Sequence, residues 1–130
     1  MHAHCSYDYA VIRVVPRVER GEFINAGVIV WCGSKDYLEA RFDLREERVR
    51  GLDPEADVDA IRRHLEGISL ICRGGETAGA LGKLSKRERF DWLIAPRSTI
   101  IQSSSAHTGR CTDLLATLER LLDVMVRPVK

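Results

Sequence analysis

The strongest constraint on the fold is a pair of consecutive segments, residues 7–15 and 22–32, whose two alternating faces are both apolar. β-branched and aromatic residues dominate them, as is typical of strands. A strand with two apolar faces needs cover on both sides, so we expect these strands to lie at the centre of the protein. Pro16 ends the first segment, Gly21 permits a turn, and the short connection predicts antiparallel pairing.

A third segment, residues 37–43, follows a turn at residues 33–36 and alternates strictly between apolar and charged side chains. Its apolar positions are Leu38, Ala40 and Phe42. This pattern predicts a half-buried strand near a sheet edge. Residues 98–104 have the composition of a fourth strand, which comes much later in the chain.

Helical periodicity fills the middle of the chain. Residues 44–52 suit a short helix or turn. Asp53 and Pro54 have the residue types of an N-cap and a first helical position. Apolar residues then recur at steps of three and four as far as Gly74, which predicts one long amphipathic helix.

Two further helices are predicted in the second half of the chain. Ser85 is a suitable N-cap for a helix over residues 86–94, and Thr112 for a last helix that ends before Pro128. Residues 76–84 and 105–110 are expected to form loops.

These elements predict an α+β fold, with a small antiparallel sheet of about four strands packed with three or so helices. Three of the strands form an N-terminal meander and one comes later. We expect one domain over residues 1–130, with residues 1–6 as a frayed N-terminus and residues 127–130 as a C-terminal tail.

Composition narrows the class of protein. The 20 basic and 19 acidic residues give a formal net charge of +1, which argues against nonspecific nucleic-acid binding. No apolar run approaches the roughly 20 residues of a membrane span. The four cysteines lie far apart without a C-x-x-C pair, which favours buried thiols in a cytoplasmic protein over a disulfide framework. We expect no metal site and no cofactor.

Two polar residues interrupt the central apolar strands. Arg13 lies on the face of Tyr9 and Val11, and the alternation places Asn25 on the face of Phe23 and Ile29. A buried arginine or asparagine must be paired or hydrogen-bonded. Either the two line a pocket for an anion or a peptide backbone, or they are architectural, with Arg13 paired to Glu19 or Glu22.

Charged residues crowd the connection between these strands, which includes Arg20 and Glu22. They form either a recognition loop or a solvated turn, and the mixed signs favour local pairing or a protein partner over phosphate.

A second polar region flanks the fourth strand and includes Arg97, Ser98, His107 and Thr108. Its hydroxyls, arginines and imidazole could bind phosphate or carboxylate.

Motifs for catalysis are weak. The chain has no G-x-S-x-G nucleophile elbow, P-loop, dinucleotide glycine motif or H-E-x-x-H motif. His64 falls on the polar side of its predicted helix, where we expect it to be solvated. No catalytic residue is therefore assigned, and the sequence favours a non-catalytic protein.

Four stretches carry a family resemblance, namely YDYAVIRVVP (residues 7–16), RGEFINAGV (20–28), ERFDWLIAPRST (88–99) and HTG (107–109). In this order they resemble domain-of-unknown-function family 3037, over essentially residues 7–126. The resemblance implies a bacterial protein from a family without an established activity, whose genes are often found beside genes for HipA-like kinases.

Two functional hypotheses remain open. In the first, the domain is an interaction or regulatory module that presents its charged hairpin and the Arg97/His107 region to a protein partner, such as a HipA-like kinase, or to a second copy of itself. In the second, it is a small enzyme or an anion- or nucleotide-binding domain, with Arg13, Asn25, Arg97 and His107 converging on one pocket.

Overall fold

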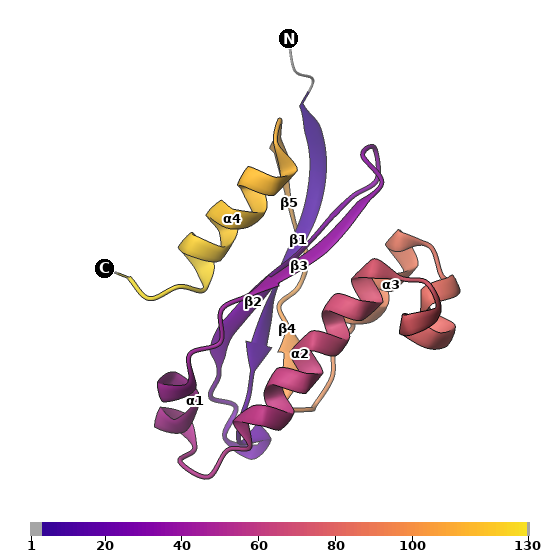
Figure 1. Ribbon diagram of the computed structural model, residues 1–130. Coiled ribbons are helices and arrows are strands. Elements are labelled where there is room, and N and C mark those ends of the chain that lie inside the picture. The colour runs from indigo at the N-terminus through magenta and orange to yellow at the C-terminus, as the bar shows by residue number, and fades with distance from the viewer. Residues whose placement is uncertain (1–3, 130) are drawn as a thin grey trace.

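The computed structural model describes residues 4–129, which form an antiparallel sheet with helices on both sides (Figure 1). The strands are β1 (Cys5–Val14), β2 (Ile24–Cys32), β3 (Tyr37–Phe42), β4 (Ile101–Ser103) and β5 (His107–Cys111). β1 is central and pairs with β2 on one edge and with β4 and β5 in turn on the other, while β3 pairs with β2. The α+β class and the meander are therefore confirmed, but the described residues form five strands rather than four.

The described chain also forms four α-helices, more than the three or so predicted, and two short 3-10 segments. These are α1 (Glu46–Leu52), α2 (Val58–Arg73), α3 (Lys86–Ile94), α4 (Leu114–Met125), η1 (Val18–Arg20) and η2 (Glu76–Lys83). None of the helices in residues 4–129 is long and apolar enough to cross a membrane.

Side-chain caps explain where α2, α3 and α4 begin, whereas α1 begins without one. Ser85 caps α3 as predicted, in a reciprocal capping box with the residue three positions on. Two other predicted caps were wrong, because Asp57 rather than Asp53 caps α2, and Asp113 rather than Thr112 caps α4. In both helices the aspartate carboxylate accepts a hydrogen bond from the backbone N–H three residues further along.

β5 was predicted to be a polar loop, and its strand conformation comes from pairing with β1. The interruption between β4 and β5 is held by Ser104, whose backbone N–H donates to the Val11 carbonyl (2.8 Å). In return the Val11 backbone N–H donates to the Ser104 hydroxyl (2.9 Å), so the side chain fills one position of the ladder. β1 thus imposes the extended conformation on residues whose own sequence is polar.

A bulge between β1 and β2 determines which face Asn25 occupies. The register skips Ala26, so that Arg13 pairs directly with Asn25. The extra residue reverses the alternation, and Asn25 lies on the face of Val28. Its predicted position on the face of Ile29 is therefore wrong.

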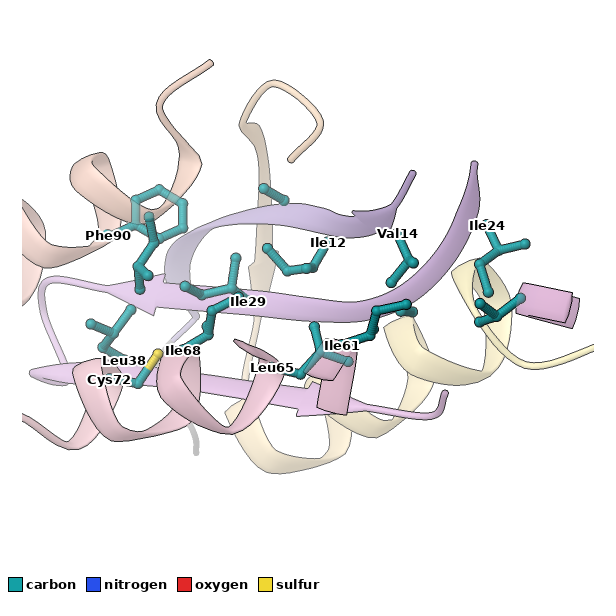
Figure 2. Close-up of a cluster of buried hydrophobic side chains, with 14 of the residues drawn as sticks. Ile12, Val14, Ile24, Ile29, Leu38, Ile61, Leu65, Ile68, Cys72 and Phe90 are labelled. Atoms are coloured by element: carbon teal, nitrogen blue, oxygen red, sulfur yellow. The ribbon is translucent and has the colours of Figure 1, made fainter. Parts of the chain in front are cut away.

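Both faces of the sheet are covered, which accounts for the two apolar faces of β1 and β2. α2 and α3 lie on one side of the sheet and α4 on the other (Figure 1). On the α2/α3 face, Ile61, Leu65 and Ile68 of α2 point toward Ile12 and Ile29 of the sheet (Figure 2). The buried cluster on the α4 face consists of Cys5, Tyr7, Val28, Val30, Cys32, Leu118, Leu121, Leu122 and Val126.

Contacts with the rest of the fold reach Cys5 near the N-terminal end of the described chain and Arg127 near its C-terminal end. Cys5 and Ser6 pair with β5, so the frayed N-terminus predicted over residues 1–6 does not include them. Residues 1–3 lie outside the described residues. In the predicted tail, the Arg127 guanidinium contacts the Asp43 carboxylate at 3.2 Å, and residue 130 lies outside the described residues.

Candidate functional site

A pocket of about 320 Å³ opens between α2, α3 and β4, and we call it the α2/α3 pocket. Its apolar lining is Ile12, Ile68, Ile71, Leu93 and Ile101. Its remaining lining residues are Arg63, His64, Gly67, Trp92, Arg97, Thr99 and Gln102. Ligand pockets combine a mostly apolar wall with a few polar groups in this way, at volumes from about 300 Å³ upward.

Helical spacing brings the α2 residues of the pocket together. Gly67 follows Arg63 by four positions and His64 by three, and Ile71 follows Gly67 by four, so these residues lie along one side of the helix. Apart from its chain neighbours and the backbone of its own helix, a Cβ atom placed on Gly67 would meet nothing within 4 Å. The missing side chain therefore leaves open space in the middle of this helix face.

Arg97 is held at the other side of the pocket by the end of α3. The chain turns to an extended conformation at Ala95, ahead of a proline, and the guanidinium folds back over the helix. It donates to the Leu93 carbonyl (3.0 Å) and to the Trp92 carbonyl, and lies 4.3 Å from the centre of the Trp92 ring. These contacts use two of its five N–H donors, so three remain for a ligand.

The lining of the pocket is electrostatically one-sided. Arg63 and Arg97 contribute positive charge, and the lining residues include no aspartate or glutamate. Within residues 4–129, neither arginine forms an ion pair with an acidic side chain. The pocket can therefore attract an anion without displacing an internal carboxylate.

Arg13 and Asn25, two of the predicted site residues, lie on the opposite face of the sheet. The Asn25 side-chain amide donates to the Met125 carbonyl at the end of α4 (3.0 Å). The Arg13 guanidinium lies 4.4 Å from the centre of the Phe23 ring. Arg13 Nε and Asn25 Oδ1 are both buried and have no hydrogen-bond partner among the described residues.

His107 and Thr108 fall at β5. His107 is exposed and lies opposite Tyr9, with 5.4 Å between the ring centres. The Thr108 hydroxyl donates to the Asp8 carboxylate (2.9 Å), which also contacts the Arg87 guanidinium (3.1 Å). Thr108 thus takes part in a polar link between β5, β1 and α3.

The charged hairpin is paired partly within itself and partly with Asp53, to which the Arg17 guanidinium donates at 3.4 Å. Arg20 contacts Glu22, and Arg17 lies 3.9 Å from Glu19, so neither glutamate pairs with Arg13. The hairpin side chains are well exposed. The hairpin is therefore solvated, and its opposite charges compensate each other.

The structure does not bring the predicted set into one pocket. The sheet separates Arg97, on the α2/α3 face, from Arg13, Asn25 and His107. Ser98 is exposed beside Arg97 and does not line the α2/α3 pocket.

Sequence reasoning missed most of the pocket. His64 is exposed, as expected for a solvated side chain, but it also lines the pocket together with Arg63 and Trp92. Gly67 was the one sequence signal for the pocket. A glycine inside an amphipathic helix destabilises the helix by about 1 kcal/mol relative to alanine, so its presence indicates a packing or functional role.

Metal binding has no visible basis in the described residues. Across residues 4–129, no group of three or more histidine, cysteine, aspartate or glutamate side chains is arranged to hold a metal ion.

Comparison with known proteins identifies one family. The family model described as "Protein of unknown function (DUF3037)" matches residues 9–126, which is nearly the whole chain. No curated protein and no solved structure matches the chain.

Proposed function

The chain belongs to the DUF3037 family, whose function is unknown, so we propose a function from the site alone. We propose that the protein is a non-catalytic module that binds an amphipathic anion in the α2/α3 pocket. The observation that carries this proposal is the pairing of an apolar floor with two arginines, Arg63 and Arg97, that have no acidic partner among the described residues.

The chemistry of the lining defines the ligand. The apolar floor favours a hydrocarbon or aromatic body, because each buried methylene contributes about 0.8 kcal/mol. The free N–H donors of Arg97 match the oxygens of a carboxylate or phosphate head group. Such a ligand would lie with its body over Ile68 and its head group between Arg63 and Arg97.

The test uses octanoate, octyl phosphate and octanol as probes, with the indole N–H signal of Trp92 followed by NMR. Trp92→Phe assigns this signal against that of Trp31. Both anionic probes should shift the Trp92 signal in a saturable way and should bind about tenfold more tightly than octanol. The anion that binds more tightly identifies the head group.

Two pairs of variants locate the binding. Gly67→Leu fills the open space in α2 and should abolish binding while the protein stays folded, because leucine has the higher helix propensity. Its control is Gly51→Leu in α1, where an added Cβ also meets nothing. Arg63→Gln should weaken the binding of the anionic probes about three- to tenfold, whereas Arg62→Gln should leave it unchanged. Octanol binding as tightly as the anions, or full binding by Gly67→Leu, would contradict the proposal.

The family resemblance supports a second candidate, an accessory partner of a HipA-like kinase in the bacterial cytoplasm. Phe23 could contribute to such a contact, because the residue is 45% exposed beside the Arg13 guanidinium and a partner that covers its ring would remove apolar surface from water. The tagged protein should co-purify with a HipA-like kinase from the same bacterium. The Phe23→Ser variant should no longer co-purify with that kinase. A monodisperse protein without kinase at micromolar concentration would count against this candidate.

A further inference from the structure

Three of the four cysteines gather on the α4 face of the sheet. Cys5 and Cys111 lie directly opposite each other in the β1/β5 pair, and their Sγ atoms are 3.8 Å apart. Cys32 of β2 belongs to the same buried cluster as Cys5, whereas Cys72 lies on the α2/α3 face. All four thiols are free.

The backbone already has the geometry that a disulfide needs. Directly opposed residues of an antiparallel pair have Cα atoms about 4.5–5.5 Å apart. Disulfides span Cα separations of about 4.4–6.8 Å. The direct pairing of Cys5 with Cys111 therefore places their backbones within the range that a disulfide spans.

Access to the two sulfurs is unequal. Cys111 is partly exposed, whereas Cys5 is 5% exposed and lies at the wall of a pocket of about 420 Å³. The other residues that line this pocket are Lys35, Thr112, Asp113 and Leu114. Burial raises the pKa of the Cys5 thiol to about 11. Cys111 therefore meets a dissolved oxidant first, and Cys5 serves as the resolving thiol at its side.

We propose that Cys5 and Cys111 form a reversible cross-strand disulfide by exchange with a low-molecular-weight disulfide such as oxidised glutathione. The Cys111 thiolate attacks one sulfur of the oxidant, which forms a mixed disulfide and releases one glutathione thiolate. The Cys5 thiolate then attacks the Cys111 sulfur and releases the second. The two cysteines lose two protons and two electrons, and one oxidised glutathione becomes two reduced molecules.

The bond would link residues 106 positions apart and would close almost the whole chain into one loop. It would also fix β5, an edge strand of polar sequence, to the central strand β1 just before α4 begins. Oxidation is therefore expected to stabilise the protein by restricting the unfolded chain. This device does not depend on the α2/α3 pocket.

The experiment equilibrates the full chain in glutathione buffers of increasing oxidised fraction, followed by acid quenching, alkylation and tryptic mass mapping. The four cysteines fall on four different tryptic peptides, residues 1–13, 21–35, 64–73 and 111–120. We expect a loss of two hydrogens, a cross-link between peptides 1–13 and 111–120, and a thermal midpoint about 5–10 °C above that of the reduced protein.

Two serine variants make the assignment specific. Cys111→Ser should abolish both the cross-link and the rise in midpoint, whereas Cys72→Ser should retain both. Four free thiols in excess oxidised glutathione would overturn the proposal. So would a cross-link from Cys5 to Cys32, or a glutathione adduct on Cys111 that Cys5 does not resolve.

Discussion

The two faces of the sheet accommodate an arginine among apolar residues in different ways. On the α2/α3 face, Arg89 is 5% exposed and donates to the carbonyls of Ile71 (2.8 Å) and Cys72 (3.0 Å) at the end of α2. On the α4 face, Arg13 is partly exposed and stacks on Phe23; its Nε, like that of Arg89, is buried and has no partner among the described residues. A guanidinium that donates to carbonyls at the end of a helix stabilises the fold, whereas one that stacks on an exposed ring contributes little to stability.

The largest effect is expected at Arg89. Arg89→Met keeps much of the side-chain volume but removes two charge-assisted hydrogen bonds. The buried Cys72 carbonyl loses its side-chain donor and the Ile71 carbonyl keeps only the Gly74 N–H, so the free energy of unfolding should fall by about 3 kcal/mol. Urea denaturation followed by circular dichroism measures this loss. Arg110→Met is the control, because Arg110 is exposed on β5, and it should change the free energy by less than about 0.5 kcal/mol. Equal effects of the two substitutions would show that Arg89 does not cap α2.

A smaller effect is expected on the α4 side, where ion pairs help to hold the C-terminal segment. Hydrogen bonds from Arg45 and Arg127 lower the pKa of the Asp43 carboxyl below its ordinary value. A depressed pKa contributes stability that is complete above the unfolded value of about 4 and is lost as the pH falls through the folded value.

We therefore expect acid to remove about 1 kcal/mol of stability through Asp43, between about pH 5 and pH 2. Urea denaturation across this range measures it, with Asp43→Asn as the comparison. The variant should be less stable than the wild type at pH 7, and the difference should shrink as the pH falls. A constant difference across the range would show that the ion pairs of Asp43 contribute nothing.

The elements of this fold that could be predicted from sequence are those whose own residues specify them. The two apolar faces of β1 and β2, the alternation of β3 and the Ser85 cap of α3 are local signals, and the structure bears them out. β5 could not be predicted, because its polar residues take strand conformation only through the free edge of β1. The face of the sheet on which Asn25 lies was predicted wrongly for a similar reason. It depends on the bulge at Ala26, and nothing in the sequence marks that residue as bulged.

The candidate site was harder to predict than the fold. Arg97 was identified from its polar surroundings, but the pocket also needs Arg63 and His64, which come from a different helix. Only the packing of α2 against α3 and β4 brings these side chains together. The separation of Arg97 from Arg13 by the sheet is likewise a consequence of tertiary structure. The sequence therefore predicted one polar site, whereas in the fold these residues lie on opposite faces of the sheet.

The smallest effect is expected at Arg13, and it tests the comparison most directly, because the same substitution is made on the opposite face. Since no carboxylate pairs with Arg13 among the described residues, Arg13→Met loses only the stacking on Phe23 and should reduce the free energy of unfolding by less than about 1 kcal/mol. A double-mutant cycle with Phe23→Leu, measured by urea denaturation, should give a coupling energy of the same size. A loss as large as that of Arg89→Met would mean that Arg13, too, is an architectural cation, and the distinction between the two faces would fail.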